Sequence, residues 1–295
     1  MKKFLLFIIF LISVINIYSI KIENNMAVDS FGNFVPLKEY NKIIAADPSA
    51  VEIFYLIGGE NKISAVAKTK INKIYPEEKT KLLESVGSIT RPSIEKIISL
   101  NPDLVILNPM GAVKTAELLK KYNIPYFIDR SVTFDEIFLK TKIYGIFTGQ
   151  EKNAEKLIEN KKNKLLKIKN EIEDKNLKGV ILYSSSPLIS FSKETIPSEI
   201  MEILKIKNIA DSFPHGKKGI ISPDVMLTEN PDIIIGTMKI HSAEDIVKAN
   251  EFLKYSKAYK NNNIYVFESE KILRATPRIA DGIEEIYEVV KNVEK

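Results

Sequence analysis

Residues 93–107 read SIEKIISLNPDLVIL, and residues 222–236 read SPDVMLTENPDIIIG. The second stretch begins 129 residues after the first, and the two align without a gap. Both have a Ser, an acidic residue two positions later, and Asn-Pro-Asp before a run of aliphatic residues. The chain therefore contains an internal repeat, with one copy in each half.

Each copy predicts a helix followed by a buried strand. The Ser can cap the helix, because its side-chain oxygen accepts a hydrogen bond from a free N–H of the first turn. The helix dipole favours an acidic residue in that turn, and the residue before Pro disfavours α geometry, so Asn-Pro ends the helix. The unalternating aliphatic residues 104–107 and 233–235 are typical of strands buried in a parallel sheet. One such unit in each half predicts two similar α/β lobes with a cleft between them.

The region between the copies predicts helices. Residues 134–148 predict a helix that ends at Gly149, and residues 151–175 contain no Gly or Pro and carry apolar residues at helical spacing. A helix over the second range is about 36 Å long at 1.5 Å per residue. We expect this one long linker helix to lie against both lobes, each with a central, mostly parallel sheet flanked by helices, and to permit only modest lobe closure.

The first residues predict export. Lys2 and Lys3 precede an uncharged stretch at 4–17, and the small residue Ser19 follows, a pattern typical of a signal peptide. We expect cleavage near Ser19 and a periplasmic protein; the alternative is a retained N-terminal anchor. The predicted organisation is a signal peptide at 1–19, an N-terminal lobe at 20–133, a helical linker at 134–176 and a C-terminal lobe at 177–295.

Composition excludes several classes of site and partner. The chain has no Cys, which excludes disulfides, thiolate metal sites, Cys nucleophiles and a lipid-modified N-terminal Cys, so we expect no lipid anchor. Its 295 residues are 45% hydrophobic and 27% charged, enough for two globular domains. The net charge is +5, but lysines are interspersed with acids, which indicates solvated helix faces rather than a nucleic-acid footprint. We expect a monomer with no nucleic-acid partner.

Catalytic signatures are sparse. The sequence has no nucleophile elbow, no His-Glu-x-x-His motif, no phosphate loop and no dinucleotide fingerprint. Its two histidines, His215 and His241, fall in predicted loops of the C-terminal lobe. We interpret them as solvated loop residues, with a role as imidazole bases as the alternative. The sequence therefore predicts no catalytic residue, no resident metal and no cofactor.

The loops at the carboxyl ends of parallel strands are the default ligand site of such sheets. Arg91 and Arg274 are candidates there, because a guanidinium binds anionic groups through two parallel hydrogen bonds. The alternative is that each pairs with a nearby acid, such as Glu84 or Glu270. The predicted ligand-binding residues are Asp47, Ser49, Lys68, Arg91, Asn108, Met110 and Arg130 in the N-terminal lobe and Tyr183, Ser185, Phe191, His215, Met238 and Arg274 in the C-terminal lobe.

Several motifs resemble one family over essentially the whole mature chain. The family is that of the periplasmic-binding proteins of iron-siderophore, haem and vitamin B12 ABC importers, the class III solute-binding proteins with a helical backbone between lobes. The strongest motif is Val86-Gly87 followed by Pro-Ser-Ile-Glu-Lys-Ile at 92–97 and Asn-Pro-Asp-Leu-Val-Ile at 101–106. The others are Leu-Ile-Gly-Gly at 56–59, Thr148-Gly149, Asn-Ile-Ala-Asp at 208–211, Arg274-x-x-Pro-Arg278 and Asp281-Gly282.

The resemblance implies a function and partners. In this family one acid on each lobe docks onto arginines of the membrane permease, and the matching positions are Glu95 and Asp224, where the family usually has Glu twice. Haem binders of the family often place a Tyr just after the Gly that corresponds to Gly87, and Ser88 stands there. The expected ligand is a small-molecule metal chelate, a ferric siderophore or related complex, with cobalamin or haem as alternatives. The expected partners are the permease and ATPase of an ABC importer.

Two functions from other classes stay open on the residues alone. One is an exported hydrolase that would use a cleft Ser with His215 or His241. The other is an anchored structural or adhesion module that retains residues 4–17.

Overall fold

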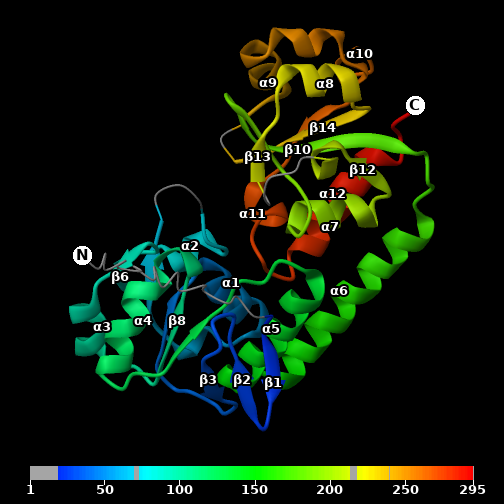
Figure 1. Ribbon diagram of the computed structural model, residues 1–295. Coiled ribbons are helices and arrows are strands. Elements are labelled where there is room, and N and C mark those ends of the chain that lie inside the picture. Colours follow the sequence, from blue (N-terminus) through cyan, green and yellow to red (C-terminus); the bar gives the residue numbers. More distant parts are fainter. Residues whose placement is uncertain (1–18, 70–72, 213–217, 239, 295) are drawn as a thin grey trace, which may run out of the picture.

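Two α/β lobes, joined along one side by helices, make up the protein (Figure 1). The computed structural model describes residues 19–69, 73–212, 218–238 and 240–294. The predicted signal peptide, apart from Ser19, and the predicted ligand residue His215 lie outside the described residues. Within the described residues no helix is both long enough and apolar enough to span a bilayer.

The N-terminal lobe is built on a six-stranded sheet in the order β7-β6-β5-β4-β8-β9. Neighbouring strands run parallel, apart from the antiparallel pair β6 and β7. Every residue of the central strands β4 and β8 is buried, which is why their sequences are aliphatic without alternation. The strands are β4 (Ile43–Ala46), β5 (Ile63–Lys68), β6 (Ser85–Ser88), β7 (Arg91–Pro92), β8 (Leu104–Leu107) and β9 (Tyr126–Ile128).

A small antiparallel sheet precedes this lobe and was not predicted. It consists of β1 (Lys21–Glu23), β2 (Met26–Val28) and β3 (Phe34–Pro36). The buried carboxylate of Asp29 accepts a hydrogen bond from the Ile128 N–H at 2.9 Å, which ties this sheet to β9. The helical segments of the lobe are α1 (Pro48–Ile57), η1 (Glu60–Lys62), α2 (Glu77–Thr80), α3 (Ile94–Leu100), η2 (Pro109–Gly111) and α4 (Ala112–Lys121).

The C-terminal lobe contains a mixed sheet in the order β13-β11-β10-β14-β15, with β12 also paired to β10. Strands β12, β14 and β15 join it in parallel, and β11 and β13 extend it antiparallel. The strands are β10 (Leu177–Ser185), β11 (Leu188–Phe191), β12 (Ile206–Asn208), β13 (Lys218–Ile220), β14 (Ile233–Gly236) and β15 (Ile264–Val266). The helical segments are α7 (Ile196–Ile203), η3 (Ile209–Ser212), α8 (Pro223–Glu229), α9 (Ala243–Ala249), η4 (Glu251–Tyr255), α10 (Lys257–Lys260), α11 (Ser269–Ile272) and α12 (Ile279–Val290).

The two repeat copies form equivalent structures, as predicted. Ser93 caps α3 and Ser222 caps α8, each accepting a hydrogen bond from the N–H three residues later. Asn101 and Asn230 end these helices in the left-handed conformation, with φ of 47° and 45°. Asn is one of the few residues other than Gly that adopts this conformation readily, so it can end a helix just before a Pro.

The Asp of each copy fastens its helix–strand turn to the neighbouring strand. The Asp103 carboxylate accepts hydrogen bonds from the N–H groups of Asn41 and Lys42, at 3.0 and 3.1 Å, just before β4. The Asp232 carboxylate accepts one from Lys178, at 2.9 Å, near the start of β10. Both lobes therefore set the register of a central parallel strand pair with the same side chain.

Two helices, rather than one, connect the lobes. The predicted long helix is α6 (Glu151–Glu171), which ends four residues earlier than expected, and α5 (Phe134–Thr148) packs beside it. Each supplies apolar side chains to both lobe cores. For the N-terminal core these are Ile143, Tyr144, Phe147 and Ala154, and for the C-terminal core Phe134, Ile137, Phe138, Leu165 and Ile168.

The contact between α5 and α6 depends on a glycine. A Cβ at Gly145 of α5 would lie 2.6 Å from the Ala154 Cβ of α6, closer than two carbon atoms can approach. At its other end α6 meets the C-terminal lobe through ion pairs from Lys161 and Lys164 to Asp281 of α12, at 2.7 and 2.8 Å. The helix pair is thus fixed to both lobes.

The start of α5 is held by a carboxylate of the C-terminal lobe. Glu199 of α7 accepts a hydrogen bond from the Phe134 N–H at 2.7 Å. Burial is the main reason that the pKa of Glu199 is raised from its ordinary value of 4.5 to about 7; the neighbouring acids Asp135, Glu202 and Glu136 contribute to this increase, and the hydrogen bond from Phe134 opposes it. The folded protein therefore binds a proton at Glu199 more tightly than the unfolded chain does.

This raised pKa predicts a pH-dependent loss of stability. The contribution of Glu199 is complete below about pH 4.5 and disappears as the pH rises through about 7, because the charged form is disfavoured in the folded state. The stability of the wild type relative to Glu199→Gln should fall across that window in urea unfolding. The exposed acid Glu117 serves as the control, since the free energy of unfolding of Glu117→Gln should change with pH as that of the wild type does. Parallel curves for Glu199→Gln as well would contradict the assignment.

Candidate functional site

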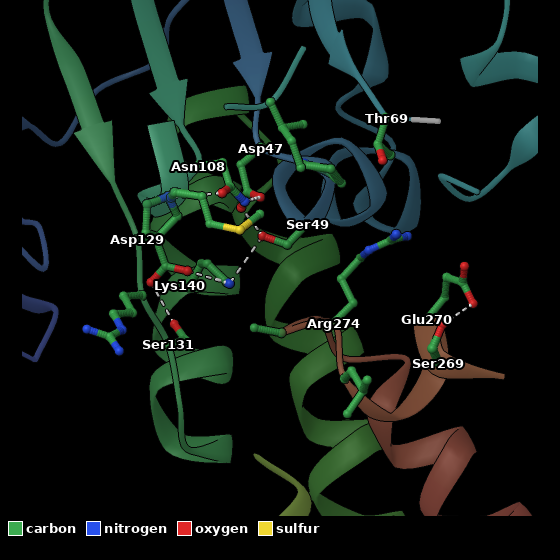
Figure 2. A pocket seen from close by; sticks show the side chains of 17 residues that line it. Asp47, Ser49, Thr69, Asn108, Asp129, Ser131, Lys140, Ser269, Glu270 and Arg274 are labelled. Carbon is green, nitrogen blue, oxygen red and sulfur yellow. Dashed lines mark hydrogen bonds and ion pairs between the residues drawn. The ribbon is translucent and has the colours of Figure 1, made fainter. Parts of the chain in front are cut away.

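A cavity of about 280 Å³ lies between the lobes, at the carboxyl edge of the N-terminal sheet (Figure 2). On the N-terminal side the loops after β4, β8 and β9 line it, and on the C-terminal side the segment from Ser269 to Ala275 does. The lining residues with polar side chains are Asp47, Ser49, Thr69, Asn108, Asp129, Arg130, Ser131, Lys140, Ser269, Glu270 and Arg274. This is the position expected for the ligand site of an open parallel sheet.

A buried ion pair forms part of this wall. Lys140 of α5 has no exposed side-chain surface, and its Nζ lies 2.5 Å from the Asp129 Oδ2 and 3.4 Å from the Ser49 Oγ. Asp129 also accepts a hydrogen bond from the Ser131 hydroxyl at 2.6 Å. A fully buried lysine is rare unless it is paired in this way.

The network continues to a second carboxylate. Asp47, at the end of β4, accepts hydrogen bonds from the Ser49 hydroxyl and, at 2.8 Å, from the Asn108 side-chain amide. Asn108 in turn accepts one from the Met110 N–H at 3.1 Å. The network therefore joins two buried carboxyl groups, Asp47 and Asp129, to one buried lysine, Lys140. It is a rigid, polar surface on one side of the cavity.

The opposite side of the cavity carries charges that bridge the lobes. Arg274, which lies between α11 and α12, hydrogen-bonds the carboxylate of Glu52 on α1, and Arg278 approaches the same Glu52 oxygen at 3.3 Å. Figure 2 shows Arg274 on the far side of the cavity from the Asp47 and Asp129 network. Arg274 does pair with an acid, the alternative left open above, but the acid is Glu52 of the other lobe rather than Glu270.

Six of the predicted ligand residues line this cavity together. They are Asp47, Ser49, Asn108, Met110, Arg130 and Arg274. Arg130 and Met110 are exposed at its rim, and Met110 has 69% of its surface exposed.

Six other predicted residues do not line the cavity. Lys68 donates a hydrogen bond to the Lys81 carbonyl, and Arg91 is exposed on the edge strand β7. The rings of Tyr183 and Phe191 pack edge to face, 5.8 Å apart, within the C-terminal lobe. The last two are Ser185 and Met238. A role for these six in contacting a ligand stays a prediction.

Lys140 and Glu52, which both lie inside helices, were not predicted as site residues. Glu52 had a signal in the sequence, because it is the one charged residue of PSAVEIFYLI; the signal of Lys140 is weaker, since its segment FDEIFLKTKIYGIF also contains Asp135, Glu136 and Lys142. Charged residues at such positions are buried only when they are paired. The sequence does not reveal their partners, since Asp129 belongs to the loop after β9 and Arg274 to the other lobe.

The described part of the chain places one of the two histidines and offers no metal-binding group. His241 is exposed, and its N–H belongs to the hydrogen-bonded start of α9. Among the described residues, no group of three or more His, Cys, Asp or Glu side chains could hold a metal ion.

Removing the buried cation should be costly. Lys140→Met leaves Asp129 charged and buried, so we expect a loss of about 3–5 kcal/mol in the free energy of unfolding. The matched control is the exposed Lys142 on the same helix, where Lys142→Met should change stability by less than about 0.5 kcal/mol. Adding Asp129→Asn to Lys140→Met should recover part of the loss in urea unfolding. Equal effects of the two lysine substitutions would show that the pair is not buried in solution.

The chain is similar to known binding proteins. A family model described as a periplasmic binding protein matches residues 43–270. An uncharacterized ABC transporter substrate-binding lipoprotein of Bacillus subtilis is 26% identical over 86% of this chain and 81% of its own length. A vitamin B12-binding protein of Vibrio parahaemolyticus is also 26% identical, over 86% of this chain and 90% of its own.

A solved structure agrees with this relationship. A possible iron-binding, periplasmic solute-binding protein of Staphylococcus epidermidis is 25% identical, with a TM-score of 0.72 over 85% of this chain and 98% of that one. The family resemblance seen in the motifs is therefore confirmed, as is the two-lobed α/β fold that it implied. The chain belongs to the periplasmic binding protein family.

Proposed function

We propose that this protein is the solute-binding component of an ABC importer, which captures a small-molecule metal chelate between its lobes and delivers it to the permease and ATPase. The observation that carries the proposal is the cavity between the lobes, with a preformed polar network on one wall and a segment of the other lobe opposite. Sites between domains, largely formed before the ligand arrives, are typical of small-molecule binding. The proposed role is binding and release, not catalysis.

For the ligand we propose an iron chelate, a ferric siderophore or related complex, first. The possible iron-binding protein of similar structure supports it. The pairing of Arg274 with Glu52 and the two carboxylates of the opposite wall favour a neutral chelate over a strongly anionic one.

Cobalamin is the second candidate, and a specific observation favours it. Relatives from several Vibrio species, each aligned over most of this chain, are named vitamin B12-binding proteins. Haem held by a Tyr after Gly87 is not proposed, because Ser88 occupies that position.

A direct titration tests the ligand class. Purified mature protein should respond to a ferric trihydroxamate or to cobalamin with a saturable change in Tyr fluorescence, since Tyr is abundant and the chain has no Trp. The same titration with haem and with a ferric tris-catecholate, both anionic, should give weaker binding. Calorimetry checks the stoichiometry, expected to be one ligand per chain. No binding of any of these chelates would contradict the proposed function.

We also propose that Glu95 and Asp224 dock onto the permease. Both are exposed and stand in the first turns of α3 and α8, the helices of the two repeat copies. Dipole stabilisation of the helix also accounts for an acid at these positions, so only a transport measurement separates the two roles.

Asp224→Ala should lower chelate uptake by cells that carry the cognate permease and leave chelate affinity of the purified protein unchanged. Asp224→Glu should preserve uptake, because the carboxylate is retained. The matched control is Glu244, an exposed acid in the first turn of α9, where Glu244→Ala should leave uptake as it was. Equal losses in uptake and affinity for Asp224→Ala would place the residue at the ligand instead.

A further inference from the structure

Glu52 and two arginines form a buried ionic cluster across the lobes. Glu52, on α1 of the N-terminal lobe, is fully buried, and the side chains of Arg274 and Arg278 are only 10% and 15% exposed. A carboxylate between two guanidinium groups in a poorly solvated place interacts with them more strongly than a surface pair does.

The cluster has further contacts to the N-terminal lobe. Arg274 donates a hydrogen bond to the Lys73 carbonyl at 2.7 Å, and the Arg278 guanidinium lies 4.2 Å from the centre of the Tyr75 ring. The Tyr75 N–H donates a hydrogen bond to Glu52 at 3.0 Å. The same Glu52 oxygen therefore binds a residue of its own lobe and, through Arg274, a residue of the opposite lobe. Separating the lobes at this edge would break these interlobe contacts of both arginines together.

The same cluster limits the ligand cavity. Arg274 lines the cavity, so the spacing that its bond to Glu52 imposes also sets the width of the cavity on that side. The volume of about 280 Å³ is just below the range of roughly 300–1,000 Å³ that is usual for small-molecule sites. A chelate built on a macrocycle, with several tens of non-hydrogen atoms, needs more room than this.

The cluster is also incompletely satisfied. The second carboxylate oxygen of Glu52 and the hydroxyl of Thr276, which lies between the two arginines in the sequence, are buried without a hydrogen-bond partner among the described residues. A buried polar network with unfilled positions is less stable than a complete one. Such a cluster can hold two lobes together and still be opened by a ligand.

We propose that Glu52, Arg274 and Arg278 are an interlobe latch, which holds the empty cleft closed and must open before a chelate larger than the cavity can enter. The identity of the ligand in this proposal rests on the proposed function, whereas the existence of the latch does not. Glu52 acts on the ligand through Arg274 and is a positioning residue. The apparent affinity for a large ligand equals the intrinsic affinity multiplied by the fraction of molecules whose latch is open. A latch that is mostly closed therefore lowers the apparent affinity.

The test measures lobe separation without any ligand. Because the chain has no Cys, Leu82→Cys in the N-terminal lobe and Tyr255→Cys in the C-terminal lobe, both at exposed positions, provide two spin-label sites. Pulsed dipolar spectroscopy should give one narrow distance distribution for the wild-type latch. Glu52→Gln keeps the side-chain shape and removes the charge, and it should add a population at longer distance.

Two further variants complete the design. Glu229→Gln breaks the Lys178–Glu229 ion pair, which lies within one lobe, and should leave the distribution unchanged. Arg274→Lys keeps the charge but loses the planar group that spans Glu52 and the Lys73 carbonyl, so it provides a second weakened latch should Glu52→Gln fail to fold. A narrow, unshifted distribution in whichever weakened latch folds would overturn the proposal.

Association kinetics measure the effect on binding. Stopped-flow mixing with cobalamin and, separately, with a ferric trihydroxamate should show an association rate constant about tenfold higher for Glu52→Gln, because the open fraction is larger. Weaker binding caused by faster dissociation would overturn the latch, since it would mean that the cluster stabilises the liganded form. If neither chelate binds the wild type, the proposed function fails, while the distance measurement still decides the latch.

Discussion

The structure depends on the shared packing of α5 and α6. These two helices contribute apolar side chains to both lobe cores, and their close approach at Gly145 and Ala154 makes them one unit. A connection made by packed helices resists bending far more than an extended linker would. Each lobe alone would expose the side chains that α5 and α6 now bury, so the two lobes and their relative orientation are stabilised by the same contacts.

The positions of the charged residues between the lobes follow from the packing of α5 and α6. The Lys140–Asp129 pair lies where α5 passes beneath the N-terminal sheet, so the helix that joins the lobes also supplies the cation of the cavity wall. Across the cavity the ion pairs of Glu52 bridge the lobes directly. The cavity therefore has a hydrogen-bonded polar network on one wall and, on the other, an ionic cluster that joins the two lobes.

Much of the fold could be predicted because the same helix–strand pattern occurs in both halves of the sequence. The capping Ser, the Asn-Pro-Asp turn and the aliphatic strand are local signals, and both copies adopt the predicted structure. The site was less accessible. Strand-end loops led to Asp47, Asn108 and Arg130. Lys140 pairs with Asp129, which lies in the loop before its helix, and Glu52 pairs with Arg274 of the other lobe, and no local rule identifies either partner. Tyr183 on β10 and Phe191 on the antiparallel strand β11 pack against each other within the lobe, an arrangement that the rule of strand-end loops does not predict.

The most direct test of this account is native-state hydrogen exchange of the wild-type protein in low concentrations of denaturant. The amides of β8, in the N-terminal core, and of β14, in the C-terminal core, should open with free energies within about 1 kcal/mol of one another and with the same denaturant dependence, because neither core can unfold without exposing the shared helices. Opening of one strand at a free energy several kcal/mol below the other would show that the lobes are independent, and would contradict the account.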